Sequence, residues 1–486
     1  MSRLAAVCLL LAACSLPAPP LGESRFPVPT AERNRFSGDW LLRRAQVLNV
    51  ETGAYERRDL VIRDGVLAEP NPDIDLPTLD GEGLYVLPGL FDAHTHLASV
   101  PGALLRGDKE DEQRIQRRLQ LRAFLASGVT SVLDCAITER VLAELRSVTS
   151  PSPTIFALSP FVTPSGGYFG RASNRHPPYD ELDPPVETAA DVEALIGDER
   201  DSVGVKVTFE EGMVFPIWPR FSSELRAAIR TSAQRHRRKL FVHSMDNESH
   251  RMALELEPYA FVHAGMEHEA FETDVLEAIK ESGAWVITTA AVFELEDWMR
   301  NPNRLSEPWL RDRVPERQMA TALDPDLEER VTALPTPMVT PWWIPNAVGE
   351  TFSSWFRNSD VAQGEVESTL RGIIALHRAG VPLVLGSDSG NWPVLATYFH
   401  GVGTIVEAEL LERAGLPRIE VIRAATINAA RMLEVDGSRG TVSVGKRADL
   451  VLYGQDPLVA GLKTFEDPVW VVYGGEARTP AGWLAD

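Results

Sequence analysis

Short apolar runs alternate with amphipathic segments through the middle of the chain. Apolar positions recur at helical spacing in Glu112–Ser127, Val192–Gly197, Ser222–Arg237, Asp274–Ser282 and Val366–Ala379. Eight apolar runs between and around them read as strands: Val86–Asp92, Val129–Asp134, Thr154–Ser159, Val203–Val207, Leu240–His243, Ala260–His263, Trp285–Thr288 and Val381–Asp388. Strands that alternate with helices are typical of a parallel sheet. Eight such units predict an α/β fold, a (β/α)8 TIM barrel over residues 86–439.

Both ends of the chain carry a different pattern, of short strands separated by glycine turns. These segments are residues 38–85 and 440–486. Neither segment is long enough to bury a sheet by itself. We therefore expect one small β-sandwich domain beside the barrel, discontinuous in sequence and built from both chain ends.

A long stretch at about 293–363 has no clean helix or strand period. It contains many prolines and five tryptophans: Trp298, Trp309, Trp342, Trp343 and Trp355. Because it follows the seventh predicted strand, it is expected on the face of the barrel that carries active sites. We predict a loop insertion, which is either an ordered lid or pocket wall, or a packing or subunit-contact segment.

The first residues have the pattern of an export signal. Arg3 precedes the apolar run Leu4–Ala13, and Leu11-Ala12-Ala13-Cys14 resembles the bacterial lipobox, in which cleavage before the cysteine is followed by its acylation. This predicts a lipoprotein-type signal peptide at 1–13, a lipid on Cys14 and a tether at 14–37. The protein would be an exported bacterial lipoprotein on a periplasm-facing membrane or the cell surface. A plain signal peptide that happens to contain Cys14 is the alternative.

Composition limits the kinds of partner that the protein is expected to bind. The formal net charge of −21 argues against nucleic acid, which needs a basic face. No other apolar run approaches about 20 residues, so membrane contact is expected through the N-terminal anchor only. Of the three cysteines, only Cys135 would remain free after cleavage and acylation, which leaves no intrachain disulfide. A monomer and a homo-oligomer both stay open.

Candidate chemistry begins at the end of the first predicted strand. Asp92, His94 and His96 are spaced two apart, so their side chains share one face of the strand. Two imidazoles in this position can bind one metal ion. Two alternating histidines are a weak signal alone, and their place after an apolar strand strengthens it.

Further residues of the metal-binding type end later strands. Lys206 lies inside the fourth strand, His243 and His263 end the fifth and sixth, and Asp388 ends the eighth. Each has a structural explanation by itself, as a hydrogen-bonded core histidine or a helix-capping aspartate. A barrel would bring all of them to one mouth, which favours a shared site.

This set of residues resembles the amidohydrolase superfamily. Gly386-Ser387-Asp388-Ser389-Gly390 is similar to the GTDAG-type segment of that family. Ala424–Arg431 resembles its following helix, and Gly440–Val451 resembles its return to the β-sandwich. The resemblance runs from Trp40 to Arg478 and is nearest to imidazolonepropionase-like and Xaa-Pro dipeptidase-like members.

The resemblance implies two divalent metal ions, with zinc as the first expectation and manganese, cobalt or iron left open. One ion would be held by His94, His96 and Asp388, and the second by His243 and His263. Lys206, carboxylated on its Nζ, would bridge them. A single ion with an unmodified Lys206 remains an alternative.

The implied activity is hydrolysis of an amide or peptide C–N bond in a small molecule, such as a dipeptide or an N-acyl amino acid, by a metal-activated hydroxide. Asp388 would accept the proton and pass it to the leaving nitrogen. Alternatives are hydrolysis of a cyclic amide, lactone or phosphotriester, or a binding protein that has lost catalysis.

Four more residues are candidates around this site. Tyr168, Arg171 and His400 are expected to contact substrate, although packing or surface roles are open for each. Asp92 is expected to support the metal ligands, or to have a simple structural role.

Overall fold

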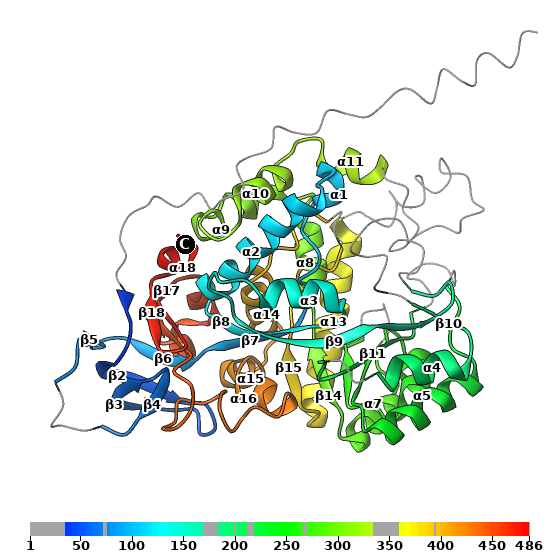
Figure 1. Ribbon diagram of the computed structural model, residues 1–486, viewed down its shortest axis with the longest axis horizontal. Helices are drawn as coiled ribbons and strands as arrows, with labels where there is room; N and C mark the ends of the chain where they lie inside the picture. The colour runs from blue at the N-terminus through cyan, green and yellow to red at the C-terminus, as the bar shows by residue number, and fades with distance from the viewer. Residues whose placement is uncertain are drawn as a thin grey trace, which may run out of the picture.

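A parallel sheet of eight strands closes into a barrel in the computed structural model, which describes residues 35–70, 75–168, 182, 184–198, 201–210, 218–265, 270–333, 359–392 and 395–485. A parallel bridge between Thr95 and Ser389 joins the last strand to the first. The predicted barrel is confirmed (Figure 1). Its strands in spatial order are β7 (Leu90–Thr95), β8 (Val129–Asp134), β9 (Thr154–Pro164), β11 (Gly204–Thr208), β12 (Leu240–His243), β13 (Ala260–Val262), β14 (Trp285–Thr288) and β15 (Leu383–Leu385), with β10 (Pro185–Val186) added to β9.

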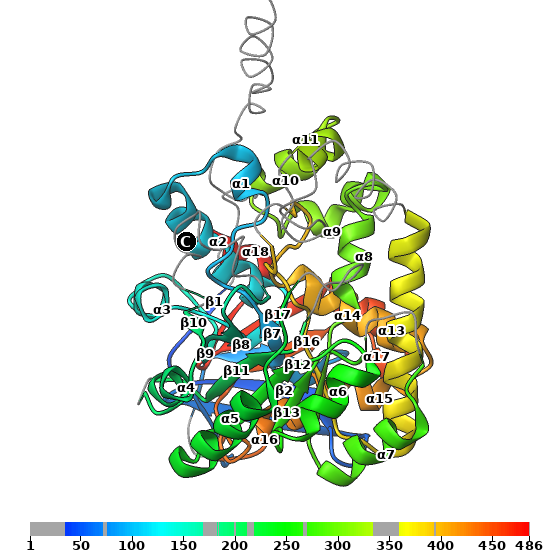
Figure 2. The ribbon, with the colours of Figure 1, turned by 90° about the vertical axis from the view of Figure 1, so that its right-hand side faces the viewer.

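Helices surround the barrel strands, and Figure 2 shows α4 to α7 and α13 on its outer side. Polar side chains start several of them: Thr138, Thr188 and Ser222 each accept a hydrogen bond from a backbone N–H in the first turn. The helices around the barrel wall are α2 (Glu110–Ala126), α3 (Glu139–Arg146), α4 (Ala189–Ile196), α5 (Ser223–His236), α6 (Asn247–Leu254), α7 (Thr273–Ser282), α8 (Ala291–Asp297), α13 (Ser359–Ala379), α14 (Val402–Arg413), α15 (Arg418–Ala424) and α16 (Ile427–Met432).

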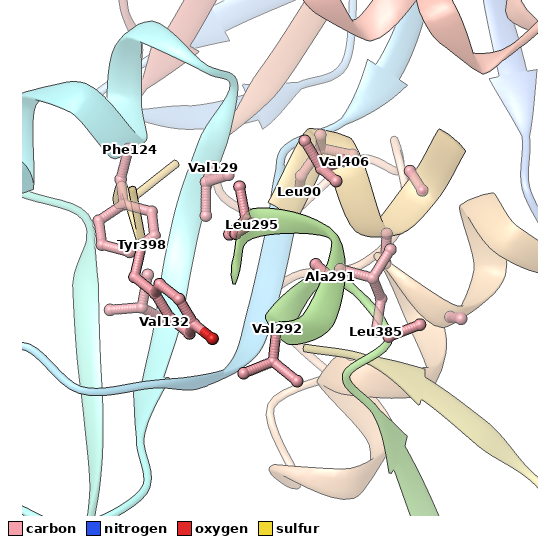
Figure 3. Packing of buried hydrophobic residues seen from close by; sticks show 14 of the residues in the cluster. Leu90, Phe124, Val129, Val132, Ala291, Val292, Leu295, Leu385, Tyr398 and Val406 are labelled. Atoms are coloured by element: carbon pink, nitrogen blue, oxygen red, sulfur yellow. The ribbon is translucent and has the colours of Figure 1, made fainter. Parts of the chain in front are cut away.

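Neighbouring residues of one barrel strand enter two different apolar clusters. Leu90 packs outward under the helices, whereas the next residue, Phe91, packs inside the barrel. Figure 3 shows the outer layer, in which Leu90 and Leu385 of the strands lie near Ala291 and Val406 of α8 and α14. Because both faces are buried, these strands are continuously apolar, which is why the sequence shows them as unbroken runs.

The two chain ends form a second sheet, beside the barrel (Figure 1). Apolar side chains from both ends, among them Trp40, Ile62, Leu452 and Val472, share one buried cluster there. The predicted discontinuous domain is thus present. Its strands are, in spatial order, β1 (Arg35–Phe36), β18 (Glu476–Arg478), β17 (Pro468–Tyr473), β16 (Leu450–Tyr453), β6 (Tyr85–Pro88), β2 (Trp40–Asn49), β3 (Ala54–Arg63) and β4 (Val66–Ala68), with β5 (Thr78–Asp80) paired to β2. Near these strands lie α17 (Pro457–Ala460), η4 (Leu462–Glu466) and α18 (Pro480–Leu484).

The single strand predicted over Val86–Asp92 is wrong, because it is two strands in two sheets. β6 pairs with β16 in the second sheet, and β7 begins the barrel. The change falls at Gly89, whose N–H donates to the carbonyl of Asp449. Hydrophobicity runs on unbroken through this point, so the sequence pattern carries no sign of the change.

Where the structure describes it, the stretch predicted as a loop at 293–363 consists of short helices joined by turns, and it ends in the start of α13. It contains the end of α8, followed by η3 (Pro302–Ser306), α9 (Pro308–Arg311), α10 (Glu316–Ala322) and α11 (Leu327–Ala333). These helices are too short to display a 3.6-residue period, and prolines at the starts of η3 and α9 imitate a loop composition. Trp342, Trp343 and Trp355 lie outside the described residues.

The inserted helices pack on the segment after β7, which contains α1 (Ala103–Arg106) and α2. Arg106 donates to Thr321 Oγ1 over 2.9 Å, and Arg317 of α10 pairs with Asp108 and Glu112. This part of the insertion therefore packs on the connection between the first two barrel strands, β7 and β8.

The predicted signal peptide, tether and Cys14 lie outside the described residues. Among the helices that are described, none has both the length and the apolar character needed to cross a membrane.

The junction between the two sheets provides a test of packing. A Cβ atom added at Gly89 would lie 2.2 Å from Thr130 Oγ1 and 2.9 Å from Thr130 Cβ. Gly89→Ala should therefore lower the free energy of unfolding by about 1–3 kcal/mol, measured by urea denaturation. Gly364→Ala is the matched control: it lies inside α13 with open space around it and should be neutral or stabilising by up to about 1 kcal/mol. Equal effects of the two changes would contradict the close packing at Gly89.

Candidate metal-binding active site

Three metal-type side chains meet at one end of the barrel. His94 lies on β7, His96 follows it, and Asp388 follows β15. Asp388 Oδ1 is 3.3 Å from His94 Nε2 and 3.1 Å from His96 Nε2. Ligand atoms bound to one zinc ion at about 2.0–2.2 Å lie roughly 3.3 Å apart in a tetrahedral arrangement. The spacing of the three side chains therefore fits a shared ion.

The chemistry of these atoms also fits a metal. One ligand atom from each of His94, His96 and Asp388 can be chosen so that all lie within 4.8 Å of one another. Both ring nitrogens of His94 and Oδ1 of Asp388 are buried without a hydrogen-bond partner. Buried polar atoms are normally satisfied, so atoms left unpaired at one point need an explanation such as a bound ion. Nitrogen and carboxylate ligands suit zinc and its neighbours in the first transition row.

Two further histidines lie next to this cluster. The ring centroid of His263 is 4.9 Å from that of His94 and 4.5 Å from that of His243. Burial lowers the pKa of His94 and His263 well below the usual range and also lowers the pKa of His243. These rings are therefore neutral at pH 7, the state in which imidazole can bind a metal.

Lys206 lies on β11, inside the barrel, and is 1% exposed. Burial lowers the pKa of its ammonium group, while Cys135, Asp388 and Asp134 act in the opposite direction. An amine in such a place is more reactive than a surface lysine, because less of it carries the proton.

Two residues of the site have unusual backbone conformations. His263 has φ 85° and Asp388 has φ 56°. Positive φ is uncommon for residues other than glycine and costs of order 1–3 kcal/mol. Both lie just after the end of a barrel strand, where the turn directs their side chains. Backbone strain at such positions is typical of functional sites.

Asp92 connects the first and last barrel strands. Its Oδ1 accepts from the backbone N–H groups of His94 (3.2 Å) and Ser387 (3.0 Å). Its Oδ2 accepts from the hydroxyls of Ser387 (2.5 Å) and Thr404 (2.7 Å). Burial raises the pKa of Asp92 to about 6, and these hydrogen bonds oppose the rise. Asp92 thus holds the backbone beside two of the metal-type ligands.

The substrate-binding candidates have different surroundings. Tyr168 is partly buried, and its ring centroid lies 4.8 Å from that of His243 and 5.3 Å from that of Trp218. His400 is 2% exposed, and its Nε2 is 3.2 Å from the backbone carbonyl of His96. Arg171 lies outside the described residues.

Three residues with contacts to this site were not predicted from the sequence. Glu210, just after β11, has Oε2 3.3 Å from His243 Nε2. Thr289, just after β14, has Oγ1 2.7 Å from His263 Nδ1. Asn391 donates from Nδ2 to Asp388 Oδ2 over 3.0 Å. Their one shared signal is a polar side chain within three residues of a strand end or of Asp388, which many barrel loops also have.

The fold and this cluster define a (β/α)8-barrel enzyme with a metal-type site at its mouth. Comparison with known proteins gives the family: the model of the amidohydrolase family matches residues 85–476. The chain therefore belongs to the amidohydrolase family, and the prediction of an amidohydrolase enzyme is confirmed.

Similarity to curated proteins is limited to short segments. A dihydroorotase of Ruminiclostridium cellulolyticum is 39% identical over 77 residues, which is 15% of this chain and 18% of that protein. An adenine deaminase of Desulfatibacillum aliphaticivorans is 35% identical over 72 residues, 15% of this chain and 13% of that protein. The chain thus spans less than a fifth of the length of either relative.

Solved structures match over a much larger range. A prolidase complexed with N-methylphosphonate-L-proline matches with a TM-score of 0.65 at 18% identity, covering 90% of this chain and 98% of that one. A Xaa-Pro dipeptidase with bound methionine matches with a TM-score of 0.62 at 18% identity, covering 90% and 99%. At this identity the likeness establishes the fold.

The hydrogen bonds of Asp92 can be tested by their removal. Asp92→Ala removes the acceptor of four buried hydrogen bonds. The Ser387 N–H keeps the carbonyl of His94 and the Ser387 hydroxyl keeps Ser389 Oγ, so the His94 N–H and the Thr404 hydroxyl lose their acceptor, at a cost of about 1–3 kcal/mol each. We expect the free energy of unfolding to fall by at least about 2 kcal/mol, measured by urea denaturation. Thr404→Val removes a single donor and should cost only about 1 kcal/mol. A loss for Asp92→Ala no greater than that for Thr404→Val would mean that Asp92 does not hold the strands together.

Proposed function

We propose that this protein is a metal-dependent hydrolase that cleaves the amide bond of a small substrate such as a dipeptide or an N-acyl amino acid. The observation that carries the proposal is the group of His94, His96 and Asp388 at the barrel mouth, whose possible ligand atoms lie within 4.8 Å of one another. Both ring nitrogens of His94 and Oδ1 of Asp388 are buried there without a hydrogen-bond partner. Structural likeness to a prolidase and a Xaa-Pro dipeptidase over 90% of the chain supports an amide substrate.

The proposed metal ligands form two half-sites, one for each ion. His94, His96 and Asp388 would hold one divalent ion, with zinc as the first expectation. His243 and His263 would hold a second ion, together with Lys206. Bound there, divalent ions would lower the pKa of a water molecule and polarise a substrate carbonyl group.

Lys206 is suited to become the bridging ligand by reaction with carbon dioxide. Burial lowers the pKa of its ammonium group, so the neutral amine form is a larger share of Lys206 than of a lysine on the surface. The Nζ lone pair adds to the carbon of carbon dioxide, and Nζ loses a proton, which gives an anionic carbamate. This change would convert a buried amine into an anionic ligand whose charge the metal ions would balance.

Asp388 would move the proton in the reaction. Its Oδ1 faces the two histidines, and its Oδ2 is held by the Asn391 amide, so the carboxylate has a fixed orientation. A carboxylate in this position can accept a proton from the attacking water and deliver it to the leaving nitrogen. The partly buried Tyr168, next to His243, lies where it could contact the substrate.

A cyclic amide, lactone or phosphotriester would present a similar reacting group to the same residues. The short matches to dihydroorotases favour the inclusion of a cyclic amide among the tested substrates.

The proposal is tested by metal removal and Asp388 substitution. The chain without its first 14 residues is purified, its metal content is measured, and a panel of dipeptides, N-acyl amino acids and one cyclic amide is screened before and after chelation. We expect about two ions per chain, turnover that disappears with the metal and returns on readdition, and a loss of 10²-fold or more in kcat for Asp388→Asn. Asp456→Asn, which keeps a helix-capping side chain at α17, should retain turnover.

Turnover that survives both complete chelation and Asp388→Asn would rule out the proposed chemistry. Metal binding without turnover on any member of the panel would favour a binding protein.

We also propose that the protein is exported and anchored by a lipid on Cys14, on the strength of the Leu11-Ala12-Ala13-Cys14 segment. Expression of the full chain in a bacterium with labelled palmitate should label the protein and place it in the membrane fraction. Cys14→Ala should abolish both results. A soluble, unlabelled full-length chain would contradict the anchor.

A further inference from the structure

Glu210 is a buried carboxylate that the proposed reaction does not use. It lies two residues past the end of β11 and is 5% exposed. Burying a carboxylate is costly unless hydrogen bonds compensate for the lost water. Its Oε2 lies 3.3 Å from Nε2 of His243, whose side chain is also buried. The pair therefore needs a reason to be inside the protein together.

The two histidines of the second half-site are contacted through opposite ring nitrogens. His243 meets Glu210 with Nε2, whereas His263 meets Thr289 with Nδ1, over 2.7 Å. A neutral imidazole carries a proton on one nitrogen and a lone pair on the other. A carboxylate accepts hydrogen bonds and donates none, so Nε2 of His243 carries the proton and Nδ1 carries the lone pair. On His263 the contact with Thr289 leaves Nε2 for a ligand.

Glu210 lies outside the group of side chains that fits the first ion. Among the described residues, the metal-type side chains that converge within 4.8 Å are His94, His96 and Asp388. His243 and His263 lie outside this group as well, so the role of Glu210 is argued from its 3.3 Å contact with the ring nitrogen of His243. A carboxylate that accepts the N–H of one metal-binding imidazole is a recurring partner in metalloproteins, where it sets the tautomer and the ring orientation.

We propose that Glu210 is a positioning residue that holds His243 with Nδ1 directed to the metal and thereby strengthens binding of the second divalent ion. The proposal rests on the metal centre of the proposed function, and it does not depend on which substrate is cleaved. Loss of such a partner typically weakens metal affinity 10–100-fold.

The test is a metal titration of the chelated chain without its first 14 residues. Zinc binding is measured by competition with a chromophoric chelator, and cobalt is used in parallel for its absorption spectrum. We expect Glu210→Ala to weaken one of two zinc affinities by 10–100-fold and to leave the other unchanged. Glu210→Gln should weaken the affected affinity less, because the amide oxygen still accepts the N–H of His243. The cobalt spectrum should change for Glu210→Ala and stay close to that of the wild type for Glu210→Gln.

A matched control separates this effect from general damage. Glu407 is also a buried carboxylate, and it accepts a hydrogen bond from the backbone N–H of Ala291, at the start of α8. Glu407→Gln should leave both zinc affinities within twofold of the wild type.

Two results overturn the proposal. Zinc affinities of Glu210→Ala within twofold of the wild type, including the case in which one ion binds in both proteins, show that Glu210 does not position a ligand. Equal losses in Glu210→Ala and Glu210→Gln show that the negative charge itself binds the ion.

If Glu210→Ala does not fold, the Gln variant provides the test. A cobalt spectrum like that of the wild type, with at most a modest loss of zinc affinity, supports the positioning role. A large loss of zinc affinity in Glu210→Gln overturns it. Absence of turnover on every amide leaves these binding results intact, so failure of the substrate assignment is recognised separately.

Discussion

The junction between the first and last strands of the barrel is the contact on which the metal-type site depends. His94 belongs to β7 and Asp388 follows β15, so they are almost 300 residues apart in sequence and meet only because the barrel closes. Asp92 bonds to both sides of this junction through His94 and Ser387. Gly386 allows the approach, because an added Cβ would lie 2.6 Å from Cβ of His94.

Closure also determines the electrostatics of the site. The barrel interior next to the site is apolar, with Phe91, Phe241 and Ile287 in one buried cluster. Burial in such surroundings disfavours charge, so it lowers the pKa values of Lys206 and of the neighbouring histidines. The histidine nitrogens are therefore in the neutral form that can bind a metal ion. A metal ion bound there would also balance the negative charge of Asp388. A metal site of this type is stabilised by the same packing that builds the barrel.

The match to the family model is much longer than the matches to individual curated relatives. The amidohydrolase family model covers residues 85–476, whereas similarity to individual curated relatives is confined to short segments. The inserted helices after α8 and Tyr168, whose ring contacts His243 and Trp218, lie on connections between barrel strands. Substrate choice is expected there, because loops on a rigid barrel can change without loss of the fold.

The sequence by itself determined the class of the fold, since apolar runs and helical periods report burial directly. It also predicted that Lys206 lies inside a strand and that the other metal-type residues lie at or near strand ends, because such residues in or after apolar runs are visible in order along the chain. These others are His94, His96, His243, His263 and Asp388. Only the tertiary structure decided where β6 ends and β7 begins, since hydrophobicity is the same on both sides of Gly89 and hydrogen bonding alone separates the sheets. It also turned the proline-rich stretch after β14 into short helices, and it brought Glu210, Thr289 and Asn391 to the ligands. These partners are recognised by distance across the barrel mouth, and a linear pattern contains no information on that distance.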